Sequence, residues 1–180
     1  AISIASNGVV TFSQTPVGAG AILQVKYFQL TTSQTTAYPT TQTDMAIPNF
    51  NINITPASTS SIIKIECNLM YETANNNQDT MWFFYRDTTK LANTESSPGL
   101  RKIGIAPASI SYFNDNSNST PESTTLTYFD TPSSTSQINY KLGVVANGTS
   151  NFFINRTVTD DNSDSNDRGV SFISVTEIVA

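Results

Sequence analysis

Asn49-Phe50-Asn51-Ile52-Asn53-Ile54 places an amide at every odd position and a large apolar side chain at every even one. Because successive side chains of a β-strand point to opposite faces, this alternation predicts a half-buried strand with Phe and Ile facing inward. The same period of two returns at residues 63–71, where Ile, Ile, Cys, Leu and Tyr occupy the odd positions. We therefore expect antiparallel sheets, each with one face on an apolar core.

Polar stretches separate further segments of strand character along the whole chain. None of these segments shows the three- or four-residue apolar spacing of a helix longer than about two turns. About ten short strands at intervals of roughly 8–15 residues predict an all-β, jelly-roll-like antiparallel β-sandwich. The other expected strands are residues 21–31, 81–85, 103–113, 124–129, 138–145, 151–158 and 170–179.

The first 18 residues are predicted to form a neck or shaft-derived hairpin, and residues 19–180 a single sandwich domain. Ile2-Ser3-Ile4 and Val10-Thr11-Phe12 flank Asn7-Gly8, a dipeptide typical of tight hairpin turns. No Pro/Gly-rich linker divides the rest of the chain. Residues 55–62 are echoed at residues 131–138, which either two similar turns or an ancestral duplication would explain.

Composition argues against several classes of function. The net charge is −5, and the nine Lys and Arg residues are scattered singly except for Arg101-Lys102, so we expect no nucleic-acid partner. No segment has the roughly 18 apolar residues that membrane insertion requires. The chain contains no histidine, and we expect Glu66 and Glu177 to lie on the solvent side of their strands. A surface-presenting protein is therefore expected rather than an enzyme.

Polar loops are the candidate receptor-binding regions, because loops held by a rigid β scaffold often carry recognition. If residues 1–18 mark the attached end, the loops farthest from them meet the host. Amide and carboxylate groups in such loops can hydrogen-bond sugar hydroxyls, although the loops could also act only as solubilising caps. The candidate residues are Asn75, Asn76, Asn77, Asp79, Asp115, Asn116 and Asn118.

The loop at residues 160–167 is the candidate metal site. Asp160, Asp161 and Asp164 supply oxygens at short spacing, as Ca²⁺ prefers. The loop departs from the calcium-binding pattern because Ser165 stands where a turn glycine belongs and no Glu closes the far end. A solvated loop without metal is the alternative, and no other cofactor is expected.

Residues 81–85 are apolar on both faces of their predicted strand. Such a strand is either central in the sandwich or has one face covered by another subunit. On the second interpretation, Trp82 and Phe84 are the candidate contacts of a homotrimer interface. Cys67, the single cysteine, is expected to be a small buried apolar residue.

Three stretches together resemble segments of tail-fibre-like structural proteins of marine tailed phages. They are residues 54–63, residues 128–136, and residues 175–180, where Thr176 stands at a position that is usually Met. The resemblance implies a virion surface protein, the C-terminal part of a homotrimeric fibre that contacts other virion proteins and a host-surface glycan or protein. It assigns no binding residues. The alternative is a capsid decoration or head-fibre protein with a purely structural role.

Overall fold

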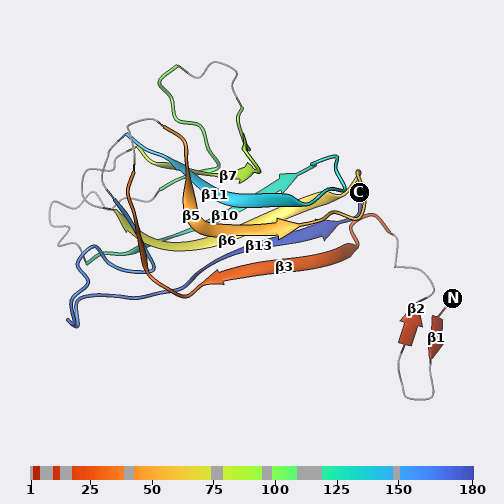
Figure 1. Ribbon diagram of the computed structural model, residues 1–180, viewed down its shortest axis with the longest axis horizontal. Coiled ribbons are helices and arrows are strands. Elements are labelled where there is room, and N and C mark those ends of the chain that lie inside the picture. Colours follow the sequence, from red (N-terminus) through yellow and green to blue (C-terminus); the bar gives the residue numbers. More distant parts are fainter. Residues whose placement is uncertain are drawn as a thin grey trace.

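The computed structural model describes residues 2–4, 10–12, 18–38, 43–73, 79–94, 99–108, 119–147 and 151–180. Within these residues every regular element is a β-strand. All the strand pairs are antiparallel. Two sheets lie one over the other (Figure 1), which confirms the predicted all-β sandwich.

The larger sheet is built around β6, the longest strand. β6 pairs with β10 along one edge and with β13 along the other, and β13 pairs in turn with β3. At the far end of β6, β12 takes the place of β13 and pairs with β4. The bounds are β10 (Glu122–Asp130), β6 (Ile62–Thr73), β13 (Ser171–Ile178), β3 (Ile22–Leu30), β12 (Phe152–Ile154) and β4 (Gln34–Thr36).

The smaller sheet has the order β5-β11-β7-β8, and β9 pairs with the start of β7. Its strands are β5 (Met45–Ile54), β11 (Ile138–Val145), β7 (Met81–Arg86), β8 (Thr89–Lys90) and β9 (Ala106–Pro107). Separately, β1 (Ile2–Ile4) pairs with β2 (Val10–Phe12), as the hairpin pattern predicted. That this hairpin serves as a neck stays a prediction.

The period-two patterns place their side chains as expected. Phe50, Ile52 and Ile54 are buried, while Asn49 and Asn53 are exposed. The predicted strand at residues 151–158 is shorter than expected and stops at Ile154. Asn155 follows it with φ of 59°, a left-handed conformation that ends the strand. Only Ala106–Pro107 of the expected strand at 103–113 is a strand among the described residues.

The sandwich has two distinct ends along its strands. At the neck end the chain enters through Gly18–Ala21, and Gly20 N donates to Val179 O at 2.8 Å beside the C-terminus. The turns at residues 55–61 and 131–137 lie at the same end. The first turn leads to Ile62, which pairs with Ile178 near the C-terminus, and the second follows Asp130, which pairs with Ile63. The connections after β3, β6, β11 and β12 lie at the opposite end, the loop end (Figure 1).

The echoed segments are two similar turns that both carry the chain from one sheet to the other. In the first, Ser58 Oγ accepts a hydrogen bond from Ser60 N at 3.1 Å. In the second, Ser134 Oγ accepts one from Ser136 N at 3.0 Å. The shared Ser-x-Ser spacing therefore has a local structural cause.

The core corrects the interface assignment of Trp82 and Phe84. Both side chains have 0% exposure within one chain and belong to the cluster between the sheets, so they have no surface to offer a neighbouring subunit. Phe83 points to the other face of β7 and is also fully buried. Its ring lies over Gly143, where a Cβ atom would come within 2.3 Å of it, and Lys90 Nζ is 4.2 Å from the ring centroid. The apolar excess of β7 is thus covered inside the same chain.

Glu177 is also placed differently from the prediction. Glu66 lies on the outer face of the larger sheet as expected, but Glu177 has 0% exposure. Its carboxylate accepts hydrogen bonds from Ala57 N at 2.6 Å, Ser61 Oγ at 2.6 Å and Gln24 Nε2 at 2.5 Å. A carboxylate can be buried here because three donors replace its water shell.

A second buried carboxylate at the neck end joins the two sheets. Asp130 on β10 accepts from Arg86 Nη1 at 2.9 and 3.2 Å and from the Tyr140 hydroxyl at 2.7 Å. Arg86 and Tyr140 belong to the smaller sheet. Burial and the bond to Asp130 raise the pKa of Tyr140. This contact fixes how the sheets sit on each other beside the neck.

We expect the stability of the fold to fall in acid through Glu177. Burial raises the pKa of its carboxyl, but the hydrogen bonds from Ser61, Gln24 and the backbone of Ala57 outweigh burial and hold the pKa below the ordinary 4.5. The stabilisation is therefore present above pH 4.5 and is lost as the pH falls through the lowered folded-state value.

Glu177→Gln should lower the unfolding free energy at neutral pH by about 1–3 kcal/mol, because an amide nitrogen then faces buried donors. Denaturant unfolding at neutral pH and at about pH 3 measures both effects. The variant should lose less stability on acidification than the parent. Equal pH dependence in the two proteins would contradict this assignment.

Candidate functional site at the loop end

The predicted receptor-binding residues fall into two groups. Asp79 is exposed and lies just before β7. The other candidates lie between described residues of the chain. Thr73, before the first group of them, and Ser119, after the second, lie at the loop end. The candidates outside the described part of the chain are Asn75, Asn76, Asn77, Asp115, Asn116 and Asn118.

A cleft of about 480 Å³ opens beside Asp79, within the range of about 300–1,000 Å³ typical of ligand pockets. Two segments form it, the start of β7 and the stretch that leads into β9. Backbone hydrogen bonds hold these segments together, Ile105 N to Trp82 O at 2.7 Å and Ala108 N to Thr80 O at 2.8 Å. The lining residues are Asp79, Thr80, Met81, Leu100, Arg101, Lys102, Pro107 and Ala108.

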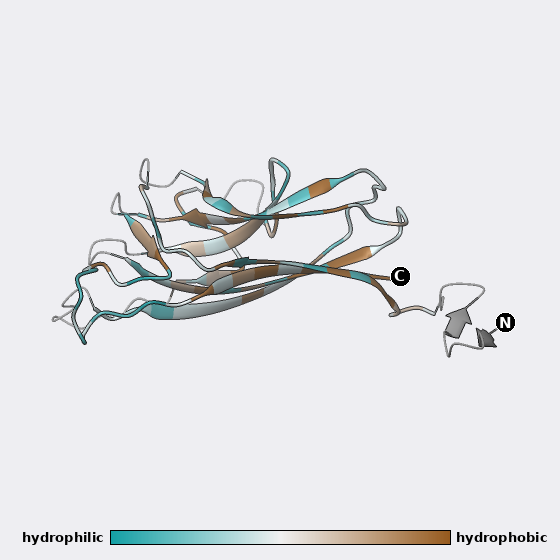
Figure 2. Cartoon of the chain, turned by 60° about the horizontal axis from the view of Figure 1, so that its bottom comes forward, coloured by the Kyte–Doolittle hydropathy of each residue, from teal (hydrophilic) through white to brown (hydrophobic). Residues whose placement is uncertain are grey.

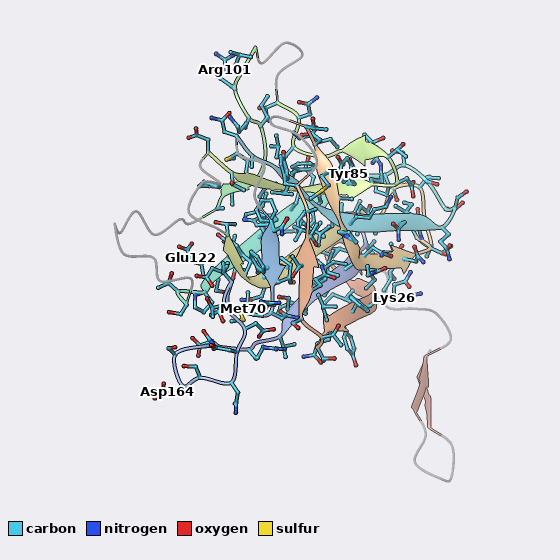
Figure 3. All side chains as sticks on the ribbon, turned by 60° about the vertical axis from the view of Figure 1, so that its left-hand side comes forward. Lys26, Met70, Tyr85, Arg101, Glu122 and Asp164 are labelled. Atoms are coloured by element: carbon cyan, nitrogen blue, oxygen red, sulfur yellow. The ribbon has the colours of Figure 1, made fainter. Side chains whose placement is uncertain are left out.

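The cleft combines three charged groups with an apolar lining. Arg101 and Lys102, the one basic pair of the sequence, lie in the same cleft as the Asp79 carboxylate. Leu100 beside them is 80% exposed. In Figure 3, which brings the loop end forward, Arg101 lies on a projecting segment at the opposite side of the view from Asp164. The basic pair is visible in the sequence, but no sequence pattern indicates that it lies close to Asp79.

Glu72, at the end of β6, holds two loop segments in place. Its Oε1 atom accepts from Thr120 N at 2.9 Å and from Thr120 Oγ1 at 3.3 Å, and its Oε2 atom accepts from Val158 N at 2.6 Å. The carboxylate is 2% exposed. It therefore fixes the segment before β10 and the loop after β12 to the same strand end, a role that no pattern in the sequence indicated.

Asn155 and Ser171 close the gap that opens where β12 replaces β13. Asn155 Nδ2 donates to Leu30 O at 2.7 Å and to Thr32 O at 3.1 Å. Ser171 Oγ donates to Asn155 Oδ1 at 2.6 Å and accepts from Met70 N at 3.0 Å. These buried side chains hydrogen-bond backbone atoms that have no strand partner where the β-ladder is interrupted.

The loop between β12 and β13 is organised by its own side chains. Asp160 is paired with two cations, Arg168 Nη2 at 2.6 Å and Arg156 Nη1 at 3.2 Å. Arg168 Nη1 also donates to Ser33 Oγ at 3.0 Å, which ties the loop to the segment after β3. Asn166 Nδ2 donates to the Asp161 carboxylate. In Figure 2 this loop is largely teal, the colour of hydrophilic residues.

This geometry does not bring the predicted calcium ligands together. Asp160 is ion-paired with two guanidinium groups, and the Asp161 carboxylate accepts a hydrogen bond from an amide of its own loop. Asp164 is exposed at the far side of the loop. In the part of the chain that the structure describes, no group of three or more His, Cys, Asp or Glu side chains could hold a metal ion.

Aromatic side chains support the loop end from inside. Tyr38, Phe152, Trp82 and Tyr71 form a chain of edge-to-face contacts, with ring centroids 5.7, 5.5 and 5.1 Å apart. The Tyr38 hydroxyl accepts from Ala146 N at 2.8 Å and donates to Thr43 O at 2.5 Å. Two connections at the loop end are therefore tied to the aromatic core.

The similarity of this chain to known proteins is one of structure rather than of sequence. No family model matches the chain, and no curated protein matches it. A solved structure of the infectious bursal disease virus Gt strain is similar over 94% of this chain and 46% of that chain, with 11% identity and a TM-score of 0.43. The VP2 subviral particle of the same virus is similar over 88% of this chain and 42% of that chain, with 11% identity and a TM-score of 0.38.

The chain therefore spans less than half the length of these solved chains. No helix among the described residues is long and apolar enough to cross a membrane.

We expect calcium to leave the thermal stability of the protein unchanged, because Asp160 is already ion-paired with Arg156 and Arg168. A site filled at a hundred times its dissociation constant would add about 2.7 kcal/mol of stability. Calorimetric melting in calcium and in chelator measures the difference. A melting temperature that rises with calcium, and no longer rises in Asp164→Asn, would show that the loop does hold the ion.

Proposed function

We propose that this chain is a structural protein of a virion, the distal domain of a fibre that adheres to a glycan or protein on the host surface. The observation that carries the proposal is the separation of the two ends of the sandwich. The incoming chain and the C-terminus lie together at the neck end (Figure 1). The cleft, beside the start of β7, and the long polar connections lie at the other end. A domain attached by its neck presents its loop end outward.

The chemistry of the cleft supports adhesion to a glycan. Arg101 and Lys102 can donate hydrogen bonds to carboxylate or hydroxyl oxygens, and Asp79 can accept them from sugar hydroxyls. Met81, Leu100 and Pro107 offer apolar contact to the C–H faces of a sugar ring. Although the whole chain carries a charge of −5, this cleft holds two cations and one anion, which suits a glycan bearing carboxylate groups.

The proposal includes the partners that the sequence resemblance implied. The domain would act as a homotrimer on the virion surface and would join other virion proteins through its neck end. The hydrogen bonds among Gly18, Gly20, Ala21 and Val179 support this arrangement, because they make the neck end a firm base. A rigid base transmits the orientation of the fibre to the loop end.

A capsid decoration or head-fibre protein is the second candidate function. It is favoured by the self-contained loop between β12 and β13, where Asp160 and Asp161 are already paired within the loop. Because the carboxylates of Asp160 and Asp161 already have partners within the loop, the loop has fewer groups to offer a receptor. In such a protein the loop end would be only a solubilising cap.

Adsorption of the purified chain to host cells separates the two functions. Charge reversal in the cleft, Arg101→Glu with Lys102→Glu, should weaken adsorption by about tenfold or more, equal to about 1.4 kcal/mol. Replacing residues 160–167 by a short Gly-Ser turn tests the loop between β12 and β13 in the same assay.

The matched control is Lys26→Glu with Lys141→Glu, which makes the same charge change on strands β3 and β11, away from the cleft. This control should adsorb like the parent chain. If every variant adsorbs like the parent while circular dichroism shows an intact fold, adhesion through the loop end is wrong and the decoration function is favoured.

A further inference from the structure

Exposed apolar side chains gather on one surface of the sandwich. Seven large apolar residues among the described ones are exposed, and Leu100 in the cleft is the single one of them away from the larger sheet. The other six lie on three strands of that sheet or next to it. They are Ile22, Val25, Tyr27, Phe129, Val170 and Phe172, with exposures of 40–77%.

The strand register shows that most of these side chains share the outward face of the larger sheet. In the row nearest the neck, Ile22 lies opposite Ile178, which lies opposite Ile62. The next row holds Val25 and Phe129 at its two ends. Farther from the neck the rows contain mainly Ser, Thr, Asn and Gln besides Tyr27 and Phe172. We call this surface the apolar outer face, and it is most apolar at the neck end.

The apolar outer face carries no net charge. Lys64 and Glu66 are the two charged side chains that β3, β13, β6 and β10 direct outward, and they pair at 2.8 Å. The whole chain has a charge of −5, so most surfaces of one copy repel another. Two copies can approach through this face without that repulsion.

Building on the homotrimer of the proposed function, we propose that the apolar outer face packs against neighbouring copies of this chain. Isoleucine and valine side chains offer no hydrogen bonds to a glycan, and their burial is favourable only against another apolar surface. Four strands about 4.8 Å apart and eight residues of about 3.4 Å each give a flat footprint of about 500 Å². With protruding side chains the accessible area approaches the roughly 800 Å² that each partner buries in a stable interface.

The apolar character of this face decreases from the neck end to the loop end, and this decrease sets the orientation of the copies. In an antiparallel pair, the isoleucine row of one copy would meet the amide- and hydroxyl-rich rows of the other. Copies that run parallel about an axis along their strands instead place their isoleucine rows at the same height, with Ile178 in the middle of each row. All necks then enter the assembly from the same side, as copies carried on one fibre would.

Sedimentation of the full chain tests the proposal. The parent should self-associate, and Val25→Glu with Tyr27→Glu should weaken association by at least about tenfold, about 1.4 kcal/mol. The matched control, Thr89→Glu with Leu100→Glu, adds the same charge at exposed positions off this face and should associate like the parent. Both substituted pairs are exposed, so the monomer fold should be kept, and circular dichroism checks it.

Cross-linking tests the orientation. Ile178→Cys, at the middle of the isoleucine row in a chain whose one natural cysteine is buried, should form covalent oligomers with a short thiol cross-linker, whereas Leu100→Cys should not. A parent chain that stays monomeric overturns the proposal, as does an oligomer that survives Val25→Glu with Tyr27→Glu. An oligomer in which Ile178→Cys does not cross-link shows that the copies do not run parallel.

Discussion

The edge-to-face contacts of Trp82 with Tyr71 and Phe152 are the interaction on which the rest of the structure depends. Trp82 comes from the smaller sheet and its two partners from the larger one, so these rings join the layers directly beneath the loop end. Trp82 Nε1 has no hydrogen-bond partner among the described atoms, and the indole therefore acts here through packing. At the neck end the buried Asp130 carboxylate joins the same two sheets. With the layers joined at both ends, each loop segment that is tied to a strand end keeps a fixed position.

The alternation of apolar and polar side chains was enough to predict the architecture, because a two-residue period in the sequence indicates which face of a strand is buried. Residues 50–54 of β5 follow that rule, with Phe50, Ile52 and Ile54 buried. The rule fails where burial depends on partners far away in the sequence. Glu177 is inward because Ala57, Ser61 and Gln24 supply donors, and nothing near Glu177 reveals them. Similarly, the apolar excess of β7 indicated an intersubunit surface, although a single glycine on β11 leaves room for the second face inside one chain.

Sites were harder to predict than strands for the same reason. The cleft joins Asp79 to a basic pair through the pairing of β7 with β9, a short ladder that no periodicity marks. The acidic loop indicated calcium by composition, but Arg156 and Arg168 at its base supply the counter-charge instead. Charge patterns alone therefore could not distinguish a metal site from an ion-paired loop. In the two proposals, the apolar outer face serves self-association and the loop end serves recognition.

The central claim is that the neck end attaches and the loop end points outward. Electron cryomicroscopy of particles carrying this protein tests that claim most directly, because it shows which end of the sandwich faces the solvent. The account predicts Gly18–Ala21 and Val179 toward the particle, with Arg101 and the loop between β12 and β13 farthest from it. A map in which the loop end is buried against neighbouring virion proteins, with the neck end free, would contradict it.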